Sequence, residues 1–328
     1  MDISVIVVTY NQERTIARTL DSILAQRTAA AYEIVIGDDC STDGTEAVCR
    51  RYAARFPDRI TYLRREANMG VTRNYFDCIA HARGRYLADC AGDDFWVDPG
   101  KLQRQFEVLE DDPGVSLVAT DWLCCDPSGE NPRRYPGLPA PAGTVSFPRG
   151  SVTADILAQR MMIHLCTAMY RKPMLDPLVA RHPDVFVNPA HTCEDQQILL
   201  AMAEAGSIVM LPEVTLHYSV GHESVSHRRS FASRFGYTLA ATRQTRMMQR
   251  HFGVADSEMR CLYRRQTSHM AAMAFRSEDP ALRRQFAEFI AETGLRPGLK
   301  GRLYMFLSAS PFIWKASLAI ASFLRRND

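Results

Sequence analysis

An apolar run near the start of the chain, "ISVIVVTY" at residues 3–10, constrains the fold more than any other feature. The run is short, continuous and rich in β-branched residues, which is typical of a strand buried on both faces of a parallel sheet. Residues 12–27 follow with apolar side chains at helical spacing, and Asn11 is the candidate N-cap. This order predicts the first strand–helix unit of an α/β sheet.

The alternation of strands and helices continues along the first third of the chain. Further buried strands are predicted at residues 33–39, 59–65, 85–91 and 116–122. Segments of helical spacing separate them, one of them at residues 71–83. Strands that alternate with helices predict an α/β fold, with a mainly parallel sheet that carries helices on both faces.

A change in composition divides the rest of the chain. Residues 126–150 hold six prolines and four glycines, which indicates a long surface loop. Strand-like and helical segments resume after it, and beyond about residue 228 the chain is Arg-rich and helical in pattern. We therefore expect two halves of one domain, 1–125 and 126–227, and a helical C-terminal extension over 228–328.

The extension is strongly basic. Residues 228–328 contain 18 Lys/Arg and 7 Asp/Glu, a balance of +11, although the whole chain carries only +2. Such a segment suggests an anionic partner, whether membrane lipid, a phosphorylated lipid carrier or nucleic acid; a solvated helical surface is the alternative. The apolar stretch 303–324 is interrupted by Pro311 and Lys315 and bracketed by basic residues. It predicts an element lying on an anionic membrane surface, or else a helix packed on the domain.

Other features bear on the compartment. The nine cysteines include no CxxC pair and no spacing with histidine that suggests a metal site. They indicate reduced thiols, and no basic segment of a signal peptide precedes the first strand. We expect a cytoplasmic protein, peripheral on the inner face of the plasma membrane if the extension binds lipid.

Polar clusters follow three of the predicted strands: Thr9-Tyr10-Asn11, Asp38-Asp39 and Asp93-Asp94. In open α/β sheets ligands bind outside the carboxyl ends of the strands, so these clusters should line one crevice. Adjacent carboxylates repel one another unless a cation neutralises them. Mg²⁺ or Mn²⁺ with a phosphorylated ligand suits such oxygen donors, and solvated loop aspartates are the alternative.

Four motifs carry a family resemblance: "SVIVVTYNQERTIARTLDSILAQ", "IVIGDDCSTDGT", "NMGVTRN" and "ADCAGDDFW". In this order and spacing they resemble the nucleotide-sugar-binding half of a family 2 glycosyltransferase of the GT-A fold. The resemblance covers roughly residues 1–125. It extends more weakly to "CEDQQILLAMAEAG" at 193–206 and to "YSVGHESVS" at 218–226.

The resemblance implies a set of donor contacts. Asp39 would accept the imide N–H of a uracil or thymine base, and Tyr10 would help to hold the base and ribose. Asp93 would contact the ribose. Arg73 and Asn74 would lie near the ribose or the phosphates.

It also implies the reacting groups. Asp94 would ligate the divalent metal that bridges the diphosphate, and Asp195 would be the general base that deprotonates an acceptor hydroxyl. Two departures affect this site. Ala91 stands where many relatives carry an acidic residue, and Ser219 stands where the late loop often has an arginine, so His222 is the candidate diphosphate contact.

The function implied is an inverting transfer of one sugar from a UDP or dTDP sugar to a hydroxyl of a glycan or lipid-linked acceptor, in bacterial surface-polysaccharide assembly. The Gln-x-x-Arg-Trp motif of processive relatives is absent from the sequence. A nucleotidyltransferase and a nucleotide-sugar-binding scaffold without catalysis are the alternatives. No nucleic-acid partner is expected, and the lack of G-x-G-x-x-G argues against a dinucleotide-binding oxidoreductase.

Overall fold

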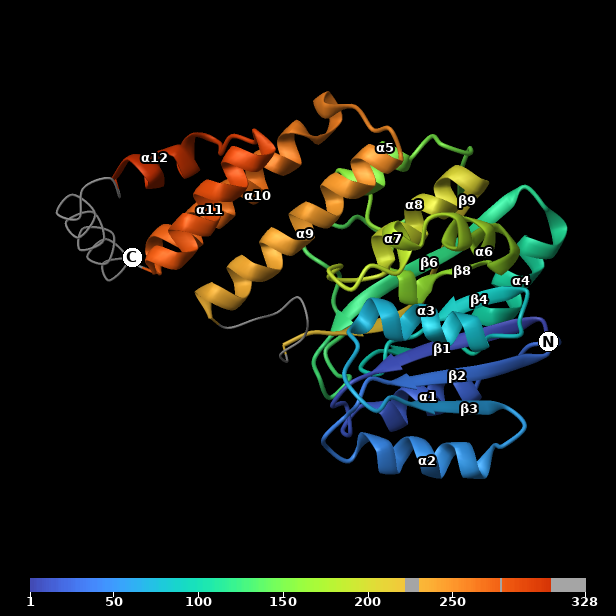
Figure 1. The fold of residues 1–328 in the computed structure, drawn as a ribbon. Helices are drawn as coiled ribbons and strands as arrows, with labels where there is room; N and C mark the ends of the chain where they lie inside the picture. Colours follow the sequence, from blue (N-terminus) through green and yellow to red (C-terminus); the bar gives the residue numbers. More distant parts are fainter. Residues whose placement is uncertain (222–229, 278, 308–328) are drawn as a thin grey trace. The chain divides into compact units, whose positions relative to one another are not determined.

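The computed structural model describes residues 1–221, 230–277 and 279–307. By their internal contacts the residues fall into two compact units, Met1–His222 and Glu223–Asp328 (Figure 1). Each unit is considered by itself below.

The first unit is built on one nine-stranded sheet of order β3-β2-β1-β4-β8-β6-β9-β5, with β7 paired to β9. Its strands are β1 (Ile3–Thr9), β2 (Tyr32–Asp38), β3 (Ile60–Arg64), β4 (Tyr86–Asp89), β5 (Phe95–Trp96), β6 (Val115–Cys125), β7 (Val145–Phe147), β8 (Met169–Arg171) and β9 (Ser207–Ser219). Its helices are α1 (Ile16–Leu24), α2 (Thr45–Arg55), α3 (Val71–His81), α4 (Lys101–Asp111), α5 (Thr153–Leu157), α6 (Lys172–Arg181), α7 (Pro183–Phe186) and α8 (Asp195–Ala205), with a 3₁₀ turn η1 (Leu165–Thr167).

The α/β class is confirmed, but only part of the sheet is parallel. β3, β2, β1 and β4 pair in parallel, as the strand–helix alternation predicts. β8 then runs antiparallel to both β4 and β6, while β6 and β9 are parallel to each other. The sheet is therefore mixed, because the three-residue strand β8 runs antiparallel between the two parallel parts.

The alternation of side chains along β1 shows why its apolar run is continuous. Val5 and Val7 belong to the same core cluster as Leu20 of α1. Ile6 points to the opposite face, because successive strand residues alternate, and it is 1% exposed. Burial on both faces favours apolar residues throughout, and the one polar residue inside the run, Ser4, is paired with Glu33 by a hydrogen bond of 2.7 Å.

The start of α1 differs from the prediction. The helix begins at Ile16 after the N-cap position Thr15, not after Asn11. Asn11 instead has a φ of 54°, a left-handed conformation that asparagine tolerates better than most residues. Its side-chain oxygen accepts the backbone N–H of Thr42 at 2.8 Å, so it joins the loops after β1 and β2.

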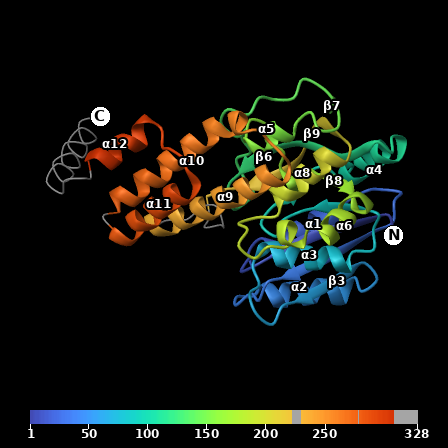
Figure 2. The ribbon, with the colours of Figure 1, turned by 45° about the horizontal axis from the view of Figure 1, so that its top comes forward.

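The second unit is helical over its described residues. It contains α9 (Phe231–His251), α10 (Asp256–Arg276), α11 (Pro280–Thr293) and α12 (Leu299–Leu307). The first three run side by side in both views (Figure 2). Phe235, Met270, Phe286 and Phe289 form their core. Among the described residues, no helix is long and apolar enough to span a membrane.

A polar network lies inside the first unit, where α3 and β8 meet the end of β4. Asp89 is 3% exposed and accepts a hydrogen bond from the Tyr75 hydroxyl, which is also bonded to the hydroxyl of Tyr170. The second carboxylate oxygen of Asp89 has no hydrogen-bond partner among the described residues. Burial raises the pKa of Asp89 to about 8, against the opposing effect of the Tyr75 hydrogen bond.

This raised pKa predicts a pH-dependent stability. The folded state holds the Asp89 proton more tightly than the unfolded chain, so its contribution to stability is lost as pH rises from about 4 towards 8. Asp89→Asn keeps the shape and cannot ionise. The free energy of unfolding of Asp89→Asn, relative to that of the natural protein, should therefore be larger at pH 8 than at pH 5, as measured by urea denaturation. An equal difference at both pH values would contradict the assignment.

Candidate active site

The polar ends of β1 and β2 lie next to each other. Thr9, the last residue of β1, is paired with Asp38, the last residue of β2. Asp38 is fully buried and accepts hydrogen bonds from the Ser41 backbone N–H at 2.9 Å and from the Tyr62 hydroxyl at 2.7 Å. The first carboxylate of the pair therefore has a structural role in fixing the loop that follows β2.

Asp39 holds a second loop. Its two carboxylate oxygens accept the backbone N–H groups of Met69 at 2.7 Å and Gly70 at 3.0 Å. These bonds draw the "NMG" segment against the end of β2, and the side chain keeps little exposure, 4%. Tyr10, one residue beyond β1, is 47% exposed. Of these two predicted donor contacts, Tyr10 presents the larger free surface.

The two predicted contacts on α3 have different surroundings. Arg73 is exposed in the first turn of the helix. Asn74 is 1% exposed; it donates to the Gly37 carbonyl at 2.8 Å and accepts from Arg65 at 2.8 Å. Asn74 therefore fastens α3 to β2, a packing role that the sequence motif did not reveal.

The Asp93-Asp94 pair follows β4 in a tight turn, and its two members face different environments. Asp94 is 1% exposed, and one of its carboxylate oxygens accepts the Ser219 backbone N–H at 2.9 Å. Asp93 is half-buried. Burial, and the adjacent charge of Asp93, raise the pKa of Asp94 well above its usual range. The more exposed carboxylate of this pair is therefore Asp93.

A polar stripe on α1 fixes this turn. Its four side chains have the spacing i, i+3, i+4 and i+7, which places them on one face of the helix. Each makes a hydrogen bond to the backbone of the 92–96 segment: Thr15 to the carbonyl of Gly92, Arg18 to that of Asp93, Thr19 to that of Asp94, and Ser22 to the N–H of Trp96. The apolar periodicity of this helix, which predicts its buried face, does not reveal the polar stripe.

Arg18 also connects the turn to the end of β9. Its guanidinium donates to the Ser219 hydroxyl at 3.2 Å and stacks over the Phe95 ring at 4.2 Å from the centroid. Ser219 in turn donates to the Asp93 carbonyl at 2.6 Å. A cationic side chain thus lies beside the position where Ser219 departs from the family pattern.

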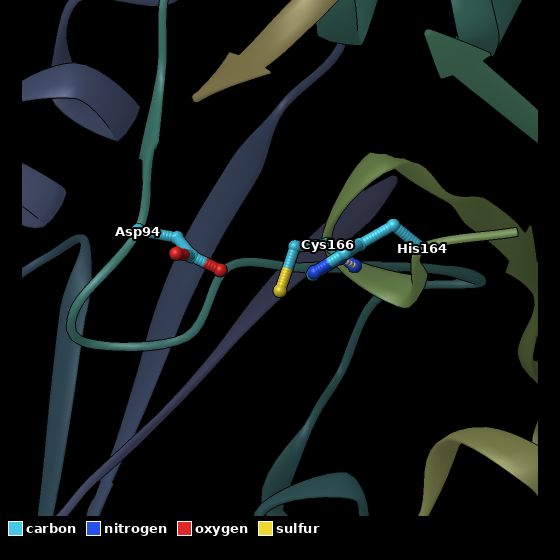
Figure 3. Close-up of side chains that lie close together, drawn as sticks. All are labelled: Asp94, His164 and Cys166. Atoms are coloured by element: carbon cyan, nitrogen blue, oxygen red, sulfur yellow. Dashed lines mark hydrogen bonds between the residues drawn. The ribbon is translucent and has the colours of Figure 1, made fainter. Parts of the chain in front are cut away.

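Two side chains from the η1 region lie against Asp94. Nitrogen of His164, sulfur of Cys166 and a carboxylate oxygen of Asp94 all lie within 4.8 Å of one another. Figure 3 shows Cys166 between the other two. Burial lowers the pKa of His164 to about 4 and raises that of the Cys166 thiol well above its ordinary value. Both groups are therefore neutral at neutral pH.

The second pair of carboxyls, Glu194 and Asp195, lies at the start of α8. Asp195 is an exposed residue, yet desolvation of its carboxyl by the surrounding protein raises its pKa to about 6. Glu194 is 8% exposed, and one of its oxygens lacks a hydrogen-bond partner among the described residues. Burial raises the Glu194 pKa well above its ordinary value. The thiol of Cys166 is close enough to Asp94 and Asp195 for both charges to raise its pKa, so the two acidic pairs share one region.

One predicted residue, His222, lies outside the described residues. The other predicted positions after β1, β2 and β4 lie at one edge of the sheet, where the carboxyl ends of these parallel strands meet. The arrangement offers an exposed aromatic residue, a partly exposed carboxylate beside a buried one, and a solvent-accessible carboxylate with a raised pKa.

Comparison with known proteins identifies relatives of this chain. The sequence profile described as "Glycosyl transferase family 2" matches residues 4–176. An uncharacterized protein, Rv1520 of Mycobacterium tuberculosis, is 34% identical over 245 residues, or 73% of this chain and 66% of that protein. The succinoglycan biosynthesis protein ExoO of Rhizobium meliloti is 28% identical over 230 residues, or 69% of this chain and 62% of ExoO. The chain thus spans slightly less than two thirds of these relatives.

Solved structures show the same fold at low sequence identity. Staphylococcus aureus TarS in complex with UDP-GlcNAc has a TM-score of 0.53 and 16% identity, covering 90% of this chain and 93% of that one. The mannosyltransferase PcManGT of Pyrobaculum calidifontis, in complex with GDP-Man and Mn²⁺, has a TM-score of 0.53 and 17% identity, covering 96% and 86%.

Proposed function

Because this chain belongs to glycosyl transferase family 2, we propose that it transfers one sugar, with inversion, from a nucleotide-diphosphate sugar to a hydroxyl group of its acceptor. UDP or dTDP is the proposed carrier, and a glycan or a lipid-linked glycan is the proposed acceptor. The observation that best supports catalysis is Asp195, a solvent-accessible carboxylate whose pKa is raised to about 6.

Asp195 has the properties that a general base needs. A carboxylate with a pKa near 6 is ionised at neutral pH and still basic enough to take a proton as an acceptor hydroxyl attacks. Burial and the charge of Asp195 raise the pKa of the neighbouring Glu194, which disfavours a second negative charge beside the base. A single displacement of this kind inverts the anomeric centre and requires no covalent nucleophile.

The donor would lie along the carboxyl ends of β1, β2 and β4. In this proposal the exposed Tyr10 ring holds the base and ribose, and the buried Asp39 accepts the imide N–H of the base while retaining its bonds to the 69–70 backbone. Arg73, exposed at the start of α3, would approach the ribose or phosphates. Asn74 is proposed to lie near the ribose or phosphates, although its side chain holds α3 to β2.

The residues after β4 fit a divalent cation. Two adjacent carboxylates, one of them buried and difficult to ionise, are an oxygen donor set that a hard cation would stabilise. Asp94 would hold the metal together with Asp93, which has the more exposed side chain and also the proposed ribose contact. Mn²⁺ or Mg²⁺ bound there would neutralise the negative charge that develops on the leaving diphosphate. PcManGT, which shares the fold, was solved with GDP-Man and Mn²⁺.

The cellular role follows from the family and from named relatives. ExoO is described as a succinoglycan biosynthesis protein, which supports a role in assembling a bacterial surface polysaccharide. In this proposal the protein acts on the cytoplasmic side, at the inner face of the plasma membrane.

The helix α12 supports membrane contact. Leu299, Leu303 and Phe306 are 84%, 54% and 73% exposed, and their spacing places them on one helical face. Lys300 and Arg302 lie on the same short helix. An apolar face with neighbouring basic residues is the combination by which interfacial helices bind anionic lipid. The rest of the predicted interfacial segment, residues 308–324, lies outside the described residues.

Two alternative functions would give different products from a nucleotide sugar. A nucleotide-sugar-binding scaffold would bind the donor without consuming it, and a nucleotidyltransferase would release a nucleoside monophosphate or pyrophosphate. Slow release of a nucleoside diphosphate from a nucleotide sugar, followed by chromatography of the products, supports glycosyl transfer alone.

Asp94→Asn tests the metal site. The substitution removes a charged ligand but fills the same volume, so the thermal unfolding midpoint should stay near that of the natural protein. Binding of UDP in the presence of Mn²⁺ should weaken strongly, as measured by isothermal titration calorimetry. The control is Asp111→Asn, which removes an exposed carboxylate at the end of α4. Unchanged UDP affinity in Asp94→Asn would show that the metal is held elsewhere.

Asp195→Asn tests the general base. UDP and Mn²⁺ should bind as before, while sugar release or transfer should fall by roughly 10²-fold or more, the usual effect of losing a general base. In the natural protein, turnover at saturating donor should decline as pH falls below about 6, because Asp195 then takes up a proton. Glu213→Gln, an exposed carboxylate on β9, is the matched control. Near-normal turnover in Asp195→Asn would transfer the role to Glu194.

The combined change Leu303→Glu and Phe306→Glu tests membrane contact in the full-length chain. It places two charges on the exposed apolar face of α12, so co-sedimentation with vesicles containing phosphatidylglycerol should fall sharply. Met162→Glu is the control, because Met162 is a 47% exposed apolar residue of the first unit. Equal sedimentation of all three proteins would count against a role for α12 in lipid binding.

A further inference from the structure

Four rings form a cluster beside Asp94, called the ring cluster below. Trp122 is at its centre, with ring centroids 5.7 Å from Tyr135, 5.2 Å from His164 and 5.8 Å from Tyr218. His164 and Tyr218 are themselves 4.7 Å apart. The four side chains come from β6, the loop after β6, the segment before η1 and the end of β9, so the fold brings them together from distant parts of the sequence.

The position of Tyr135 is fixed although it lies in the proline-rich loop. Arg133 and Cys124 exchange backbone hydrogen bonds of 2.8 Å in both directions, which folds the loop back onto β6. Next along the chain, Arg134 makes two bonds to the carboxylate of Asp121, at 3.0 and 2.8 Å, and Asp121 is 5% exposed. A paired, two-pronged contact of this kind holds a segment in one orientation. The loop therefore presents Tyr135 in a defined position.

The ring cluster is continuous with the candidate active site. His164 belongs to the group whose atoms lie within 4.8 Å of one another with Asp94 and Cys166. Tyr218 directly precedes Ser219, whose backbone N–H is bonded to the Asp94 carboxylate. The four rings differ in exposure: Trp122 is buried, His164 and Tyr218 are half-buried, and Tyr135 is 40% exposed.

Building on the proposed function, we propose that the ring cluster is the acceptor subsite, and that it binds a pyranose ring of a glycan acceptor by stacking. The C–H face of a pyranose is weakly apolar, and its hydrogens are attracted to the negative face of an aromatic ring. Rings held in place by packing lose little conformational entropy on binding, which favours affinity. A sugar stacked on Tyr135 or Tyr218 would lie beside the donor-side carboxylates.

This assignment also explains why the loop is tied down. A disordered proline-rich loop would have to be ordered on each binding event, and that cost would reduce the affinity for the acceptor. Because the ion pair between Arg134 and Asp121 orders the loop when the chain folds, the loop does not have to be ordered again on binding. The ring cluster is thus a preformed surface, and the acceptor sugar is the occupant that its chemistry and its place beside Asp94 favour.

The test uses the full-length protein loaded with UDP and Mn²⁺, and methyl pyranosides of glucose, galactose, mannose and N-acetylglucosamine as probes. Saturation-transfer NMR should show contact between the protein and the ring protons of at least one probe. Tyr135→Ala should raise the dissociation constant of that probe by about tenfold, the upper range for loss of an aromatic stacking contact. Tyr135→Phe keeps the ring and should bind the probe as the natural protein does.

UDP binding separates the two proposals. If the natural protein binds UDP with Mn²⁺ but none of the pyranosides, or if Tyr135→Ala binds the probe unchanged, the acceptor subsite is wrong while the proposed function stands. If neither UDP nor dTDP binds the natural protein in the presence of Mn²⁺, the proposed function itself fails. Calorimetry should give the same UDP affinity for all three proteins, which excludes a general loss of folding in Tyr135→Ala.

Discussion

Placing a carboxylate inside a protein costs free energy unless a partner compensates its charge, and Asp94 is held inside this fold at 1% exposure. The backbone N–H of Ser219 donates a hydrogen bond to this carboxylate, and the neighbouring charge of Asp93 makes its ionisation harder. Three parts of the surrounding structure contact Asp94 or the turn that carries it. The α1 stripe bonds to the backbone on both sides of it, β9 ends at it, and η1 brings His164 and Cys166 against it. Such a site favours a cation, which is the basis of the proposed metal.

The loops that carry the proposed site are fastened to the strands and helices beside them. The turn after β4 is fastened to α1, the 69–70 backbone to Asp39, and the proline-rich loop to β6 through Arg133. The proposed base, Asp195, is at the first residue of α8 and not in a loop. Fixed positions matter because transfer needs donor, base and acceptor hydroxyl in one geometry, and a small displacement costs much of the rate. In this proposal Tyr135 contributes specificity from a loop that a strand holds in place.

The sequence predicted the strands well where burial determines composition, as in the apolar run of β1, whose two faces are both covered. It showed which strand ends are polar, and since parallel strands place their carboxyl ends at one edge of the sheet, it predicted that these residues lie together. It indicated a strand-like segment at residues 165–171, which contains β8, but it did not predict that this strand runs antiparallel to its neighbours. It also missed the separate environments of Asp93 and Asp94, the packing role of Asn74 and the α1 stripe. Each depends on long-range contacts, such as that from Ser219 to Asp94, which one sequence cannot reveal.

The central claim is that this chain transfers sugar with inversion, from a metal-bound nucleotide diphosphate to a hydroxyl deprotonated by Asp195. The most direct measurement is time-resolved proton NMR of an α-linked UDP-sugar incubated with concentrated protein and Mn²⁺, before the released sugar mutarotates. The account predicts that the β-anomer of the sugar appears first, together with UDP, because water replaces the acceptor in a single displacement. Release of the α-anomer first, or no cleavage of any UDP- or dTDP-sugar, would contradict it.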